Sequence, residues 1–192
     1  MPRSVLIYGN PILKQVSQPV EGSTPALRRF IDELARTMYD SDEGVGLAAS
    51  QVGELIRAVV IDIDHVKTEE NPNPHRRLQV FLNPEVIWES DEDSVYKEGC
   101  LSIPGVEAKI YRPRAVVVRY RDLDFKGVEV RADRFLGRVL QHEIDHLNGL
   151  LFVDRLNFAQ RALIAGRLSR LRHDSGRMAL AGREGKSGRP LI

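Results

Sequence analysis

The segment 134–147 constrains the fold most, because it combines an apolar helical stripe with three ionisable side chains. The stripe consists of Phe135, Leu136, Val139, Leu140, Ile144 and Leu147, and an Asn148-Gly149 stop signal follows it. His142 and His146 are one helical turn apart, so both imidazoles can point at the same ion. Burying them together with Glu143 is costly unless they find partners. We therefore expect a central helix whose two histidines share a metal ion.

The residues His142-Glu143-x-x-His146 form the pattern typical of metal-dependent hydrolases. Two neutral imidazoles bind the ion in such sites. Glu143 is rotated by about 100° from His142, so its carboxylate can reach a water on the metal without binding the metal itself. A short pattern of common residues also arises by chance, but its place on an amphipathic helix favours the metal site.

Two histidines do not hold a catalytic ion, so a third ligand is needed. Downstream of the helix, Asp154, His173 and Glu184 stand in no familiar pattern. Upstream, the only cysteine of the chain, Cys100, lies in YKEGCLSIPG. A lone cysteine is often a small buried hydrophobe, but a thiolate is also a strong ligand for a first-row divalent ion. A His-His-Cys set would leave the fourth position open for water, as in catalytic sites.

The remaining pattern predicts one α+β domain over residues 1–172 and a flexible tail over 173–192. A helix capped by Thr24 and Pro25 should run until shortly before Gly44, and a last helix should run from about Asn157 to about Arg172. Strands are expected at 58–64, 80–90, 114–124 and 127–133, with an exposed loop at 67–77. This order predicts mixed, mostly antiparallel β-sheets packed around the metal-binding helix, with an N-terminal and a C-terminal helix.

The charge balance argues against nucleic acid or membrane lipid as a partner. The chain has 28 basic and 27 acidic residues, for a net charge of +1 with neutral histidines. No stretch approaches the roughly 18 apolar residues of a membrane span, and the N-terminus resembles no targeting segment. We expect a cytoplasmic protein. His65 and His75 are expected to face solvent, and neither they nor His173 are given a role.

Three segments resemble the three motifs of the peptide deformylase family, in the family's order. They are GVGLAASQ (44–51), EGCLS (98–102) and QHEIDH (141–146), and the likeness extends over roughly residues 1–172. One such motif would be weak, whereas three in order are specific.

The resemblance implies a role for each motif residue. Cys100, His142 and His146 become the metal ligands, and Glu143 becomes the acid/base that acts on metal-bound water. The side-chain amide of Gln51 and the backbone N–H of Leu101 become the donors to the carbonyl oxygen under attack, and loss of one such donor typically costs about 10²–10³ in rate. Asp145 is implied to pair with Arg114 and to hold the helix against the sheet.

The implied reaction is removal of the formyl group from the initiator N-formylmethionine of nascent polypeptides, with release of formate. Fe²⁺ is implied in the cell, with Zn²⁺ or Ni²⁺ as alternatives in purified protein, and transient contact with the ribosome is expected. We predict that the substrate is bound by Gly44, Val45, Gly46, Tyr96, Gly99, Phe135, Arg138 and Val139. Gly44 and Gly46 suit close approach of a substrate backbone.

Three alternatives stay open at this point. A metalloprotease that cuts internal bonds would need a third ligand downstream of the helix. A structural metal module would fill the fourth position and would have no use for Glu143 or Gln51. An inactive relative of the family would keep the fold, although every motif residue needed for the chemistry is present.

Overall fold

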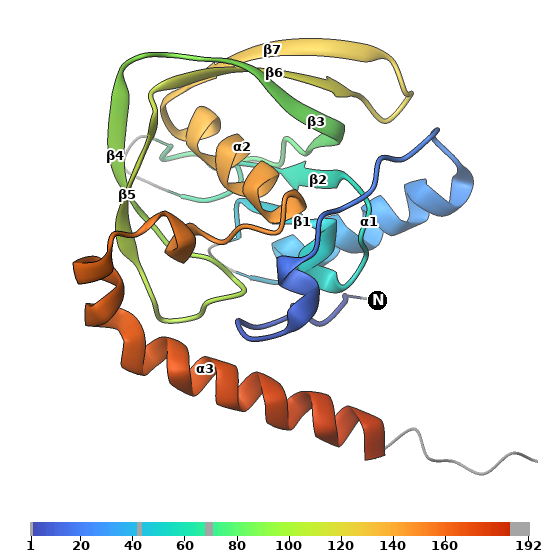
Figure 1. Ribbon diagram of the computed structural model, residues 1–192. Helices are drawn as coiled ribbons and strands as arrows, with labels where there is room; N and C mark the ends of the chain where they lie inside the picture. Colours follow the sequence, from blue (N-terminus) through green and yellow to red (C-terminus); the bar gives the residue numbers. More distant parts are fainter. Residues whose placement is uncertain (1, 42–43, 68–70, 185–192) are drawn as a thin grey trace, which may run out of the picture.

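The computed structural model describes residues 2–41, 44–67 and 71–184 (Figure 1). Its five-stranded sheet is antiparallel throughout and has the order β1-β2-β3-β6-β7. The strands are β1 (Gly46–Ala48), β2 (Ala58–Ile61), β3 (Gln79–Glu89), β6 (Ala115–Arg121) and β7 (Gly127–Asp133). A separate antiparallel pair is formed by β4 (Asp93–Glu98) and β5 (Ala108–Pro113).

The helix α2 (Arg134–Leu147) lies in the middle of the molecule, with the strands arranged around it (Figure 1). One face of α2 packs on the large sheet, where Val139, Leu140 and Ile144 join a core that includes Phe81 and Val116. This packing fixes the helix against β-strands from both halves of the chain, so the side chains on its other face are held in place.

Two further helices flank this centre. The helix α1 (Pro25–Tyr39) packs on β1 and β2, and α3 (Phe158–Glu184) runs along the outside of the molecule (Figure 1). Short 3-10 helices connect the elements: η1 (Pro11–Lys14), η2 (Ala49–Val52) and η3 (Phe152–Arg155). The predicted α+β class, with its central, N-terminal and C-terminal helices, is confirmed.

The predicted helix ends agree with the structure in three cases. The hydroxyl of Thr24 accepts a hydrogen bond from Leu27 N at 3.1 Å. Asn148 is the C-cap residue of α2, and Gly149 follows it with a left-handed φ of 73°. The side chain of Asn157 accepts a hydrogen bond from Gln160 N at 2.9 Å. Local capping chemistry was therefore sufficient to place these ends.

Three predictions about the chain differ from the structure. The helix α3 continues to Glu184, past the end expected near Arg172, while residues 185–192 of the predicted tail lie outside the described residues. The pair β4 and β5 was not recognised as separate strands. The side chain of His65 is only 13% exposed, because its ring packs edge-on against Tyr39 and its Nδ1 lies 2.7 Å from the Asp62 carbonyl oxygen. His75 is exposed, as predicted, and residues 68–70 of the predicted loop lie outside the described residues.

Candidate active site

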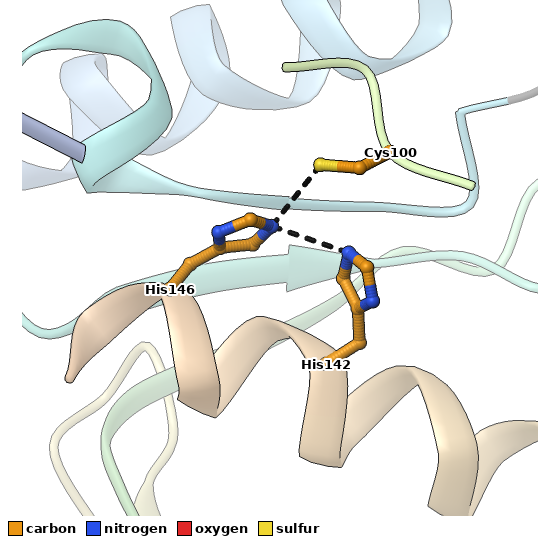
Figure 2. A group of neighbouring side chains, drawn as sticks. All are labelled: Cys100, His142 and His146. Carbon is orange, nitrogen blue, oxygen red and sulfur yellow. Dashed lines mark hydrogen bonds between the residues drawn. The ribbon is translucent and has the colours of Figure 1, made fainter. Parts of the chain in front are cut away.

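Cys100, His142 and His146 meet at one point between α2 and the loop that follows β4 (Figure 2). Cys100 Sγ lies 3.3 Å from His146 Nε2, and His146 Nε2 lies 3.2 Å from His142 Nε2. The three ligand atoms all lie within 4.8 Å of one another, and within residues 2–41, 44–67 and 71–184 no other group of three His, Cys, Asp or Glu side chains is arranged in this way. The three predicted ligands are thus brought together.

The chemistry of these donors fits one divalent ion. Metal–nitrogen and metal–sulfur bonds of roughly 2.0–2.3 Å place neighbouring ligand atoms about 3–4 Å apart, which agrees with the observed separations. The Nε2 atoms of His142 and His146 face each other at 3.2 Å, so the lone pairs of both imidazoles can bind one cation placed between them. The site therefore has the ligand types and spacing of a candidate metal centre.

The two imidazoles differ sharply in their affinity for a proton. Burial opposes a charge on His142, but hydrogen bonds to Cys100 and Glu98 outweigh that penalty and raise its pKa. Burial and the neighbouring His142 together lower the pKa of His146 well below its usual range. The pair therefore accommodates a single positive charge. A metal ion bound by both imidazoles would supply that charge.

Glu143 lies beside the ligands in an environment that disfavours its negative charge. Burial raises the pKa of Glu143 to about 7, although His142 and Arg112 pull in the opposite direction. Its Oε2 is buried and has no hydrogen-bond partner within the described residues. A carboxylate with a pKa near neutrality can take up and release a proton at the working pH.

Gln51 closes the site on the side of β1. Its Oε1 accepts a hydrogen bond from Ala48 N at 2.9 Å, and its Nε2 lies 3.5 Å from Cys100 Sγ. Leu101 follows Cys100 directly in the chain and lines the same cleft. The two predicted donors, the Gln51 amide and the Leu101 backbone, are therefore next to the ligand group.

A cleft of about 700 Å³ opens onto these side chains. It is lined by all eight residues that were predicted to bind the substrate, namely Gly44, Val45, Gly46, Tyr96, Gly99, Phe135, Arg138 and Val139. Arg138 forms a fixed wall rather than a mobile cover, because its guanidinium is buried and donates to Glu98 Oε1 at 2.9 Å. Such a cleft has the volume of a small-ligand or peptide site.

The sequence model of the polypeptide deformylase family matches residues 2–162 of this chain. A peptide deformylase of Mesorhizobium japonicum is 43% identical over 180 residues, which cover 94% of this chain and 98% of the relative. A peptide deformylase of Bartonella quintana is 44% identical over 162 residues, which cover 84% of this chain and 88% of the relative. This chain belongs to the peptide deformylase family.

Solved structures of the peptide deformylase family have the same fold. A peptide deformylase from Legionella pneumophila has 34% sequence identity and a TM-score of 0.78, covering 92% of this chain and 99% of its own. A plant peptide deformylase has 30% identity and a TM-score of 0.80, covering 99% of this chain and 95% of its own. The predicted family and enzyme class are confirmed.

The predicted partner of Asp145 was wrong. Asp145 accepts hydrogen bonds from Arg112 Nη1 at 2.6 Å and from both Nε and Nη2 of Arg155 at 2.6 Å. Arg114 instead bonds Glu92 at 2.9 Å, with 67% of its side chain exposed. The reason is that β5 ends at Pro113, so Arg112 still faces the interior with the strand while Arg114 lies beyond its end.

Glu98 is a site residue of this deformylase-family chain that sequence reasoning missed. Its Oε2 lies 2.9 Å from His142 Nδ1, and its carboxylate also accepts hydrogen bonds from Arg112 and Arg138. Burial disfavours the charge, but the bonds from Arg112 and His142 hold the pKa of Glu98 well below its usual range. The glutamate before Gly99 in EGCLS was the available signal, since metal-binding histidines commonly contact a carboxylate through their second nitrogen.

The metalloprotease alternative needed a third ligand downstream of α2. Asp154 instead pairs with Lys14, and the side chain of His173 is exposed. The third candidate ligand in the described part of the chain is Cys100.

No helix in the described ranges combines the length and the apolar character that crossing a bilayer requires.

Proposed function

We propose that this chain removes the formyl group from the N-formylmethionine that begins nascent polypeptides, and releases formate. The observation that carries the proposal is the position of Glu143, which lines the cleft next to the Cys-His-His group and whose buried Oε2 has no hydrogen-bond partner within the described residues. Membership of the peptide deformylase family supports the same reaction.

Cys100, His142 and His146 would hold one divalent ion. When bound, such an ion lowers the pKa of a water molecule and polarises the formyl carbonyl group. The thiolate of Cys100 donates charge and makes the ion less electrophilic than an all-histidine site would. We infer Fe²⁺ in the cell, with Zn²⁺ or Ni²⁺ acceptable in purified protein, and loss of activity in air as Cys100 oxidises.

Glu143 is assigned both proton transfers. It takes a proton from the attacking water while the water oxygen bonds to the formyl carbon. The carbon–nitrogen bond then breaks, and Glu143 delivers that proton to the leaving amine of methionine. The products are formate and a polypeptide with a free N-terminus.

Gln51 and Leu101 are assigned the role of hydrogen-bond donors to the oxygen of the formyl group. The Gln51 Nε2 and the Leu101 backbone N–H would donate to this oxygen as negative charge develops on it. Tyr96, Phe135, Arg138 and Val139 form the wall against which the methionine side chain would pack. The backbone of the glycine-rich segments would pair with the extended peptide.

The setting of the reaction follows from its substrate. A formylated N-terminus is present while the polypeptide is being made, so we infer transient contact with the ribosome and a cytoplasmic location. The balanced net charge of +1 gives no field that would favour direct binding of nucleic acid.

The test is formate release from a formyl-methionyl peptide by protein purified without oxygen and loaded with Fe²⁺. We expect turnover by the wild type and a loss of about 10²–10⁴ in rate in Glu143→Ala. Folded, metal-loaded wild type that releases no formate would contradict the proposal. Cys100→Ser serves as a second control, since it should bind far less metal, whereas a protease-type site would keep its ion.

A further inference from the structure

Ser102 lies behind Gln51 and contacts its side-chain amide. We propose that Ser102 is a positioning residue that orients the Gln51 amide toward the reacting carbonyl group. This inference rests on the proposed function, because it concerns one of the two donors assigned to the formyl oxygen. It adds a residue to which neither the motif resemblance nor the comparisons assign a role.

The hydrogen bonds around Gln51 determine which end of its amide faces the metal centre. Oε1 accepts from Ala48 N at 2.9 Å, and a backbone N–H can only donate, so the oxygen must lie on that side. The NH₂ group consequently points to the opposite side. There, Nε2 lies 3.1 Å from Ser102 Oγ and 3.5 Å from Cys100 Sγ.

The two hydrogens of this NH₂ group have different destinations. One is donated to Ser102 Oγ, and the other is directed toward Cys100 Sγ and the cleft. Because the group is planar, fixing the first hydrogen also fixes the direction of the second. Without Ser102 the amide would keep its Ala48 contact and the longer contact of Nε2 with Cys100 Sγ, and the last torsion of a glutamine side chain is intrinsically broad.

Ser102 is itself rigidly held and does not line the cleft. It is 0% exposed, and its carbonyl oxygen accepts a hydrogen bond from Tyr8 N at 2.8 Å. Leu101 and Ile103 line the cleft on either side of it, whereas Ser102 faces Gln51. Ser102 therefore acts on the reaction through Gln51 and makes no contact of its own with the substrate.

Kinetics of Ser102→Ala, Gln51→Ala and the double variant test this role. Loss of one buried hydrogen bond corresponds to about a fivefold to tenfold effect. We expect kcat of Ser102→Ala to fall by that factor with KM within twofold, and the same change in the Gln51→Ala background to alter kcat by less than twofold. An equal loss in both backgrounds, or wild-type kcat in Ser102→Ala, would overturn the proposal.

Ser17→Ala is the matched control. Ser17 is also a buried serine, but its hydroxyl has no partner within the described residues and it lies outside the cleft. Its kcat and KM should equal those of the wild type. A loss of kcat in Ser17→Ala as large as that in Ser102→Ala would mean that removing any buried hydroxyl slows the enzyme, and would overturn the assigned role.

A second readout is independent of turnover. In NMR spectra of the zinc-loaded protein, the Gln51 side-chain NH₂ signals are assigned by their absence in Gln51→Ala. We expect Ser102→Ala to shift these signals and to speed their exchange with solvent at least tenfold. Unchanged signals would overturn the positioning role even if formate is released. If wild type releases no formate while the signals shift, the proposed reaction fails and the orientation of the amide stands.

Discussion

At the scale of single residues, Gly46 controls the space available to Glu143. A Cβ atom at Gly46 would lie 2.6 Å from Glu143 Oε1 and 3.0 Å from Val139 Cγ1. The group that would lie closest to such a Cβ atom is therefore the carboxylate of Glu143, the general base that we propose. At Gly44 the same atom would lie 2.6 Å from the carbonyl oxygen of Met38, which belongs to the backbone and cannot turn away.

These contacts predict different outcomes for two alanine substitutions. Gly46→Ala should displace the Glu143 carboxylate and lower formate release about 100-fold, since a misplacement near 1 Å is that costly. Its free energy of unfolding should change by less than about 1 kcal/mol, because Glu143 is a side chain that can move. Gly44→Ala should instead lose about 1–3 kcal/mol of stability. Kinetics and denaturant unfolding measure both, and Gly22→Ala, with open space around it, is the neutral control.

Glu98 carries a second prediction at this scale. Glu98→Gln removes the buried counter-ion of Arg138 and leaves Arg112 with Asp145 alone, so the protein should lose about 3 kcal/mol of stability. The Nδ1 of His142 also exchanges a charged carboxylate partner for a neutral amide, which should weaken metal binding about 10–100-fold. Denaturant unfolding and titration with Co²⁺ measure the two effects. Arg114→Ala removes only an exposed ion pair and should change stability by less than about 0.5 kcal/mol; a large loss there would contradict the revised pairing of Asp145.

At the scale of elements, a phenol–carboxylate bond joins α1 to the end of β2. The hydroxyl of Tyr39, the last residue of α1, donates to Asp62 Oδ2 at 2.5 Å. Asp62 directly follows β2, and its N–H donates to the Val45 carbonyl oxygen at 2.9 Å. Asp62 therefore contacts both Tyr39 and Val45, and Val45 lines the cleft.

This contact predicts a loss of stability at alkaline pH. Burial, followed by the hydrogen bond to Asp62, raises the pKa of Tyr39 above its ordinary value. The folded state thus holds the phenol proton more tightly than the unfolded chain does. The stabilisation is fully present below about pH 10, the ordinary tyrosine value, and is lost as the pH rises through the folded-state pKa. Thermal midpoints of wild type and Tyr39→Phe should converge above pH 10; a constant difference would refute this.

At the scale of the whole molecule, α3 connects the C-terminal part of the chain to the rim of the cleft. Leu168 is 5% exposed and packs with Tyr8 and Ile103 in one core cluster. Arg167 Nη1 donates to the Gly105 carbonyl oxygen at 3.3 Å, and Gly105 lines the cleft. Docking of α3 therefore supports the loop that carries Cys100 and Ser102.

Two leucines of α3 test this docking. Leu168→Ala should cost about 2–4 kcal/mol, because it removes buried contacts and leaves a cavity. Leu163→Ala removes a side chain that is 86% exposed and should leave stability unchanged. Denaturant unfolding of both variants provides the comparison. Equal effects would show that α3 is not held through its Leu168 face.

The sequence by itself determined the helix α2, its C-terminal stop and the three segments that meet in the cleft. Helical spacing reports which side chains share a face over one turn, so His142, Glu143 and His146 could be placed without any tertiary contact. Cys100 could be added because it is the only cysteine and lies in a recognisable motif. Helical period and motif chemistry therefore suffice to predict functional residues that lie on a single helix or in a single motif.

The tertiary structure alone decided the partners of these residues. Whether Arg112 or Arg114 reaches Asp145 depends on where β5 ends, and Glu98 reaches His142 only because β4 and β5 fold beside α2. Ser102 meets Gln51 across 51 positions of the chain. Pairing between distant segments depends on the path of the whole backbone, and a short-range sequence pattern carries no record of that path.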